Sequence, residues 1–474
     1  MDAVKTRQAD AARRTLYAAY EPLIEINDDL TRALVSFQGN KKEPFYRWFK
    51  YKEGFSSRLV RYFLEGADVK RGALLDPFAG AGTALFAARD IGWDAVGIEL
   101  HPVPLFAIET RLAVEQLPVA KLDRAIERIE SKAYTGPRAS FPHLNITTGA
   151  FPPGNEQALM AYWRYCRTRV KDPYVRRVLE FAALCVLEET SYTRKDGQYL
   201  RWDARSPKKN GKGSFRKAQI VRFHQAITRK LRMIRSDLDA LAGAGGLFRS
   251  PASRRGFLDL REGSCLEVLP SVGPDAVDFV VTSPPYCNRY DYTRTYALEL
   301  ALLGRDGDDV KRLRQALLSC TVENRAKRDE IKGHYEARGT AESFAFVEDS
   351  FGSIEALQEV LSILEHLGAT GKLNNVNVPR MVRNYFYEMS FVIYELSRVV
   401  RPAGKVVMVN DNVRYAGEEV PVDLILSELA KRMGFTVERI WVLPRGKGNS
   451  SQQMGSHGRR ELRKCVYVWE KHEK

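Results

Sequence analysis

Apolar residues occur in short runs near residue 75 and again in the second half of the chain. Residues 73–76 (ALLD) and 95–99 (AVGIE) are apolar runs that each end in an acid, and residues 84–91 between them have helical character. Short apolar runs bounded by turn residues predict buried strands, and their alternation with a helix predicts a βαβ unit. Gly92 is a typical helix stop. The pattern predicts an α/β fold with a mostly parallel sheet.

The same alternation resumes after a long interval. Residues 115–255 and 305–372 contain helix-like stretches but no strand–helix rhythm, so we expect two insertions in a core made of residues 1–114, 256–304 and 373–474. Within the first insertion, helices are predicted at 174–189 and from 218 to about 241. The later core is predicted to contain strands at 256–260, 277–282, 405–410, 436–443 and 464–470, with helices at 388–400 and 422–433.

Composition narrows the class of protein. The 474 residues are 44% hydrophobic, which allows a sizeable core, but no run approaches the roughly 20 apolar residues of a membrane helix. The first residues contain no apolar signal-peptide segment, and Asp2 and Asp10 argue against a transit peptide. Six scattered cysteines without a CxxC pair, and histidines without ligand spacing, exclude a disulfide scaffold and predict no metal site. We expect an intracellular protein without a membrane segment.

The positive charge is concentrated in one place. The formal net charge is +15, and residues 194–235 contain 14 Lys and Arg against two acids. Such a cluster can neutralise several phosphates, and the interleaved Tyr199, Trp202 and Phe215 suit base or sugar contacts. A solvated basic loop is the alternative. A second basic stretch, residues 444–464, has two interpretations: a loop that contacts phosphates, or a long connection within a hairpin.

The first motif is DPFAGAGT, which follows the strand at 73–76. A turn at the carboxyl end of the first strand is where α/β sheets bind ligands, and Gly80 and Gly82 let a ligand approach the backbone. Asp76 can accept a hydrogen bond from an ammonium group, and Glu99 can accept from ribose hydroxyls. Leu85 occupies the third position of a dinucleotide GxGxxG, and no Walker lysine is present, which disfavours nicotinamide cofactors and ATP. A tight structural turn is the alternative.

The second motif is TSPPY, directly after the strand at 277–282. Two prolines fix an extended turn and free the preceding carbonyls from sheet pairing. Those carbonyls and the Ser283 hydroxyl are acceptors, and Tyr286 adds an aromatic face. This set suits a planar amine such as the exocyclic amine of a flipped base. A rigid turn with a buried tyrosine is the alternative.

Together, the two motifs resemble those of the DNA amino-methyltransferases, which methylate N4 of cytosine or N6 of adenine. The resemblance implies a Rossmann-like class I methyltransferase with a seven-stranded sheet that uses S-adenosylmethionine. By position it assigns cofactor binding to Asp76, Pro77, Phe78, Gly80, Gly82, Thr83 and Glu99. It assigns the target base to the catalytic segment Ser283, Pro284, Pro285 and Tyr286.

Motif order and two further segments extend the resemblance. In the family's α group the cofactor motif comes first, then a long insertion and then the PPY motif. The same order here implies that residues 115–255 recognise the target, with residues 305–372 as the alternative. The upstream segment 43–60 also looks like the family's methionine-side element, and Lys52 to Ser56 (KEGFS) is the part that matches; an ordinary amphipathic lead-in helix is the alternative. The tail from 448 is similar to the C-terminal hairpin of cytosine-N4 members.

Ser283 before Pro-Pro-Tyr is more typical of cytosine-N4 enzymes than of adenine-N6 enzymes, so the resemblance favours N4 of cytosine. Many relatives have Gly-Asp after the strand at 256–260, whereas this chain has Gly263-Ser264. Cys287 follows the stacking tyrosine, so it is not expected to be a C5-type nucleophile. The alternatives are an adenine-N6 enzyme, an RNA base methyltransferase and an inactive nucleic-acid-binding relative.

The resemblance also implies the partners. Double-stranded DNA is the expected substrate, in the cytoplasm of a bacterial or archaeal cell. The protein is expected to serve a restriction–modification or defence system. No nuclease constellation is evident in the chain, so cleavage would require a separate restriction endonuclease.

Overall fold

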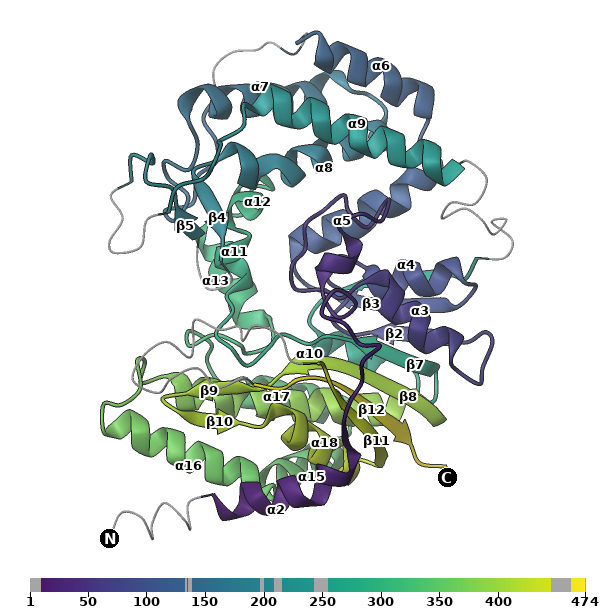
Figure 1. Ribbon diagram of the computed structural model, residues 1–474, viewed down its shortest axis with the longest axis vertical. Coiled ribbons are helices and arrows are strands. Elements are labelled where there is room, and N and C mark those ends of the chain that lie inside the picture. Colours follow the sequence, from purple (N-terminus) through teal and green to yellow (C-terminus); the bar gives the residue numbers. More distant parts are fainter. Residues whose placement is uncertain are drawn as a thin grey trace.

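An eight-stranded sheet forms the centre of the protein (Figure 1). The computed structural model describes residues 10–132, 134, 139–196, 200–208, 215–242, 255–444 and 462–473. The strands lie in the order β1 (Ile24–Ile26), β11 (Phe435–Val442), β12 (Lys464–Lys471), β8 (Val400–Asp411), β7 (Val277–Thr282), β2 (Ala73–Asp76), β3 (Asp94–Glu99) and β6 (Leu258–Glu262).

The sheet is mostly parallel, as the α/β pattern predicts. Strands β8, β7, β2, β3 and β6 are parallel to one another, and β12 is antiparallel to both β8 and β11. All seven predicted strands are present. The expected count of seven is wrong by one, because β1 from the N-terminal lead-in pairs in parallel with β11. A three-residue strand is too short to produce a period-2 signal in the sequence.

The alternating side chains of the central strands face two hydrophobic cores. Leu74 of β2 and Phe279 of β7 pack with α3 (Ser57–Glu65), α4 (Thr83–Asp90) and α5 (Pro102–Ala113). Leu75 and Val280, the next residues along, point to the opposite face. That face is covered by α17 (Val378–Val399) and α18 (Val422–Arg432), and α15 (Ala341–Gly352) and α16 (Glu355–Ala369) pack on α17 in turn.

The described residues between 115 and 255 form a helical unit beyond α5, at the top of Figure 1. The first core continues into this unit through residues such as Phe181 and Leu231. Its predicted helices are present, and a short antiparallel pair, β4–β5, was not predicted. The elements are α6 (Val119–Glu130), α7 (Pro153–Arg169), α8 (Pro173–Thr190), β4 (Thr193–Lys195), β5 (Leu200–Trp202) and α9 (Phe223–Ala242).

Residues 305–372 are helical, and two of their helices extend the second hydrophobic core by packing on α17. Besides α15 and α16, this segment contains α13 (Gly307–Ala316) and α14 (Arg328–Ala337). The remaining elements include α2 (Ala11–Tyr20), α10 (Cys265–Val268), α11 (Tyr292–Thr295), α12 (Ala297–Leu302) and the pair β9 (Val413–Tyr415) and β10 (Glu418–Val420). Among the described residues, no helix has both the length and the apolar character needed to cross a membrane.

Candidate active site

The turn between β2 and α4 depends on two glycines in the left-handed region of backbone space. Gly80 has φ of 51° and Gly82 has φ of 77°. A Cβ atom at Gly80 would lie 2.8 Å from the ring of Tyr51, and one at Gly82 would lie 2.9 Å from Ile108. Backbone conformation and space therefore both favour glycine at these positions. The tight turn predicted from the motif is present.

Glu99 connects this turn to the next strand. One carboxylate oxygen accepts a hydrogen bond from the backbone N–H of Gly80 at 2.7 Å, and the other accepts from the N–H of His101 at 2.6 Å. Burial raises the pKa of the Glu99 carboxyl to about 8, although these N–H groups favour its charged form. The carboxylate thus holds the ends of two neighbouring loops together.

Asp76 connects the same turn to the second motif. Its Oδ1 accepts hydrogen bonds from the Thr282 hydroxyl at 2.7 Å and from the Phe78 backbone N–H at 3.1 Å. Thr282 ends β7 and immediately precedes Ser283, so the two motifs meet at adjacent strand ends. Burial raises the pKa of the Asp76 carboxyl to about 7.

One pocket of about 910 Å³, partly open to solvent, lies where these segments meet; we call it the active-site pocket. Gly82, Pro284 and Tyr286 are not among its lining residues, so Gly82 acts on the pocket through the backbone of the turn. The predicted residues that line it are Asp76, Pro77, Phe78, Gly80, Thr83, Glu99, Ser283 and Pro285.

The charges around the active-site pocket favour a cationic ligand. Asp76, Glu99 and Glu53 line it, and burial is the largest influence on all three carboxyl groups and raises each pKa. Arg111 is the one Lys or Arg among the lining residues that the structure describes. Its guanidinium donates to backbone carbonyls, including that of Phe45 at 3.1 Å, rather than to these acids. A bound positive charge would stabilise the ionised carboxylates.

The KEGFS segment contributes three of its five residues to the active-site pocket: Glu53, Gly54 and Phe55. Lys52 instead donates from Nζ to the backbone carbonyl of Lys195 at 2.9 Å. Ser56 caps α3 by accepting from the N–H of Leu59 at 3.3 Å. The helix alternative therefore applies only from Ser57 onward.

In the Ser-Pro-Pro-Tyr segment, the hydroxyl groups of Ser283 and Tyr286 are 3.4 Å apart. Both residues are partly exposed, so a ligand can reach them. Cys287 is fully buried, and burial holds the pKa of its thiol well above the usual value. Because the thiolate is the nucleophilic form of cysteine, this environment disfavours covalent catalysis by Cys287.

Some lining residues carry no signal in the sequence. Residues 316–318, from the segment treated as a second insertion, form part of the active-site pocket wall. Ser264 donates to the carbonyl of Ala316 at 3.2 Å, and buried Glu388 accepts from the N–H of Ser319 at 2.8 Å. Only the tertiary fold brings 316–318 to the site. Further lining residues without a motif are Phe37, Tyr46, Phe49, Tyr51, His101 and Tyr292.

The basic segment, residues 194–235, presents cations around aromatic rings. The guanidinium groups of Arg194 and Arg201 lie 5.9 Å and 5.5 Å from the centre of the Phe215 ring. Lys208 lies 4.5 Å from the Trp202 ring. Tyr199 lies outside the described residues, as do residues 445–461 of the second basic stretch.

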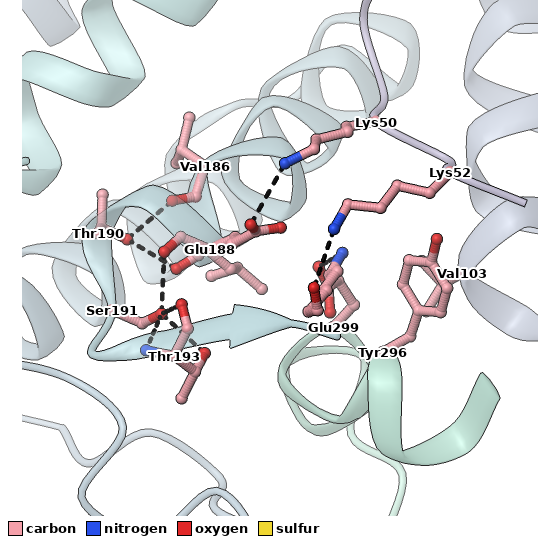
Figure 2. Close-up of polar contacts among 12 residues, drawn as sticks. Lys50, Lys52, Val103, Val186, Glu188, Thr190, Ser191, Thr193, Tyr296 and Glu299 are labelled. Atoms are coloured by element: carbon pink, nitrogen blue, oxygen red, sulfur yellow. Dashed lines mark hydrogen bonds and ion pairs between the residues drawn. The ribbon is translucent and has the colours of Figure 1, made fainter. Parts of the chain in front are cut away.

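A second pocket, of about 1210 Å³, lies beside the basic segment and shares Phe49 with the active-site pocket. Figure 2 shows its polar surroundings: Lys50 points to Glu188 of α8, and the amine of Lys52 lies near Glu299, where it donates to the backbone carbonyl of Lys195. The distance between Lys50 Nζ and Glu188 Oε1 is 3.3 Å. The Lys and Arg residues that line the second pocket are Lys50, Arg194, Lys195, Arg216, Lys217 and Lys230.

The sheet order, the glycine turn after β2 and the Ser-Pro-Pro-Tyr segment after β7 together define a Rossmann-like methyltransferase core. Comparison with known proteins gives the family. The chain is 46% identical over 463 residues to the type II methyltransferase M.AvaI of a Nostoc species and of Anabaena variabilis, covering 97% of this chain and 93% of each relative. It is 38% identical over 466 residues to the type II methyltransferase M.BsoBI of Geobacillus stearothermophilus, covering 95% and 90%.

The chain therefore belongs to the type II methyltransferases. No model of a protein family matches it.

Proposed function

We propose that the protein transfers a methyl group from S-adenosylmethionine to the exocyclic N4 of cytosine in double-stranded DNA. The observation that carries this proposal is the hydrogen bond between Thr282 and Asp76, which joins the two motifs at one acidic pocket. The similarity to M.AvaI over 97% of the chain supports the transfer of a methyl group.

The active-site pocket suits S-adenosylmethionine, which carries an ammonium, a sulfonium and ribose hydroxyls. Both described hydrogen bonds of Asp76 use Oδ1, so Oδ2 can accept from the ammonium. Glu99 can accept from ribose hydroxyls, and the tight turn at Gly80 lets the cofactor approach the backbone. Pro77, Phe78 and Thr83 line the same wall. When bound, the sulfonium supplies an electrophilic methyl group.

The Ser283–Tyr286 segment would hold an extruded cytosine. An exocyclic amine is a weak nucleophile because its lone pair is delocalised into the ring. The Ser283 hydroxyl and the Pro284 carbonyl would accept its N–H groups and orient the lone pair, and Tyr286 would stack on the base. Serine before Pro-Pro-Tyr favours cytosine over adenine, and the buried, neutral Cys287 favours direct transfer.

We assign target recognition to residues 115–255, inserted in a core formed by 1–114, 256–304 and 373–474. The exposed cations of the basic segment would contact phosphates, and its aromatic rings would contact bases or sugars. Segment 305–372 would support the cofactor side, since residues 316–318 line the active-site pocket. The protein would mark host DNA in the cell, and a separate restriction endonuclease would cleave unmarked DNA.

Nucleoside mass spectrometry tests the proposal. The protein is expressed in a host without DNA methylation of its own, and its DNA is digested to nucleosides. We expect N4-methylcytosine, and sequencing would then identify the modified site. N6-methyladenine instead would contradict the choice of base, although the fold and the direct transfer would stand. A soluble protein that leaves DNA unmodified would favour RNA as the substrate.

A further inference from the structure

Lys195 belongs to the basic segment, but its environment is unlike that of its neighbours. It ends β4, and its side chain is only 7% exposed, whereas the preceding Arg194 is exposed. Its Nζ lies 2.6 Å from Glu299 of α12, whose side chain is 1% exposed. A cation so enclosed, with a carboxylate partner, is poorly placed to reach a DNA phosphate.

Lys195 also contacts the ring of Tyr296. Its Nζ lies 4.1 Å from the centre of that ring, which is fully buried and stacks on Tyr51 at 5.6 Å. The Tyr296 hydroxyl donates to Oε2 of Glu53 at 2.5 Å. Contacts thus run from β4 of the helical unit, through Tyr296, to a carboxylate on the wall of the active-site pocket.

Glu53 continues these contacts to the catalytic segment. Its other oxygen, Oε1, accepts a hydrogen bond from the hydroxyl of Tyr290, four residues after Tyr286. Glu53 therefore holds two tyrosines of the stretch that follows the Ser-Pro-Pro-Tyr segment. A displacement of Tyr296 would move Glu53 and, through Tyr290, the backbone that carries Tyr286.

We propose that Lys195 is a positioning residue of the methyl-transfer site, acting on the Tyr286 loop through Tyr296 and Glu53, and that it is not a phosphate contact. This inference rests on the proposed function, in which Tyr286 stacks on the target base. Lys195 would then not belong to the cations of the basic segment that contact DNA. The helical unit would affect the rate of methyl transfer as well as the affinity for DNA.

The test compares adjacent residues on opposite faces of β4. K195M and R194M are assayed on unmethylated duplex DNA that the wild-type protein methylates, with DNA affinity measured between about 50 and 200 mM salt. K195M is expected to lower kcat roughly 10- to 100-fold and to leave the salt dependence of DNA affinity unchanged. R194M is expected to reduce the slope of log affinity against log salt by about 1.

Two more variants protect the test against simple misfolding, because K195M leaves Glu299 buried and unpaired. K195M/E299L removes both charges, and Y296F removes only the hydroxyl that donates to Glu53. Both are expected to lower kcat while cofactor affinity is kept. Y296F and E53Q together are expected to lose no more than the larger single loss, because they interrupt the same contact.

Two results would overturn the inference: a reduced salt slope in K195M, or an unchanged kcat in Y296F and K195M/E299L. A wild-type protein that methylates no DNA would instead contradict the proposed function itself.

Discussion

Two buried aspartates, one in the active-site pocket and one in the basic segment, have pKa values shifted in opposite directions. Asp76 in the active-site pocket and Asp203 in the basic segment are 2% and 0% exposed. Burial raises the pKa of Asp76 to about 7, whereas the hydrogen bond from Arg205, at 2.7 Å, lowers the pKa of Asp203. At Asp203 the hydrogen bond from Arg205 outweighs the cost of desolvation, whereas at Asp76 the hydrogen bonds from Thr282 and Phe78 do not.

The same difference separates the two binding surfaces. In the active-site pocket, no Lys or Arg of the described residues is among the main influences on the pKa of Asp76 or Glu99, so a cationic ligand such as a sulfonium cofactor would stabilise their ionised forms. The basic segment satisfies its own acids and still presents exposed cations such as Arg194 and Arg216, which matches a polyanion. If each surface binds its own ligand independently, a substitution in one should leave the ligand of the other unaffected.

The largest effect is expected from Asp76→Ala. Removing one partner of a buried charge pair costs about 2–5 kcal/mol, so cofactor affinity should fall by at least roughly 30-fold. Calorimetric titration with S-adenosylmethionine measures this loss. The matched control is Asp68→Ala, which removes an exposed aspartate. An unchanged affinity in Asp76→Ala would contradict the assignment of the ammonium site.

Tyr286→Ala should act on turnover and not on the cofactor. Stacking a base on an aromatic ring contributes about 1–3 kcal/mol, so kcat should fall roughly 5- to 150-fold. Methyl transfer to DNA at saturating cofactor measures the effect, and cofactor affinity should stay within about twofold because Tyr286 does not line the active-site pocket. Tyr62→Ala, an exposed tyrosine of α3, is the control.

Cofactor affinity should depend on pH. Because the pKa values of Asp76 and Glu99 are raised to about 7 and about 8, both carboxyls are largely protonated at pH 6. A cation binds the ionised forms, so binding should release protons and strengthen at least roughly fivefold from pH 6 to 7.5, below the α-amino pKa of about 7.7–8.0. Calorimetry in buffers of different ionisation enthalpy measures the protons. If cofactor affinity depended on pH equally strongly in Asp76→Asn, the ionisation of Asp76 would not be the cause of the pH dependence.

The raised pKa values also predict how the stability of the cofactor-free protein depends on pH. A carboxyl whose folded pKa is raised favours folding only while it is protonated. The contribution of Asp76 and Glu99 is therefore fully present below about pH 4, falls progressively above it, and is lost once the pH has passed through about 7 to 8; bound cofactor should offset that loss.

The smallest effect is expected from Arg216→Met. Losing one exposed cation of the basic segment should reduce the salt slope of DNA affinity by about 1 and leave cofactor affinity unchanged. Titrating duplex DNA at several salt concentrations measures the slope. Lys431→Met, an exposed cation of α18, should leave the slope as in the wild type.

Local patterns were sufficient for most of the fold. The seven predicted strands are present because each is an apolar run bounded by turn residues, and the turn at Gly80 and Gly82 is present because few other residues tolerate its backbone. The three-residue β1 was missed because it lacks a periodic signal. The helix at 388–400 extends back to Val378, because burial on the sheet continues the apolar face.

Residue type and short-range spacing were enough to predict the α/β class, the two motifs and the location of the positive charge. Which residues share a pocket depends on the folded chain: Asp76 contacts Thr282, 206 positions away, and residues 316–318 form part of the pocket wall. The folded chain also decides which lysines are free for a polyanion, since Lys195 and Arg194 are adjacent in the chain but face opposite environments. Burial and partners depend on contacts between distant segments, and no local pattern encodes them.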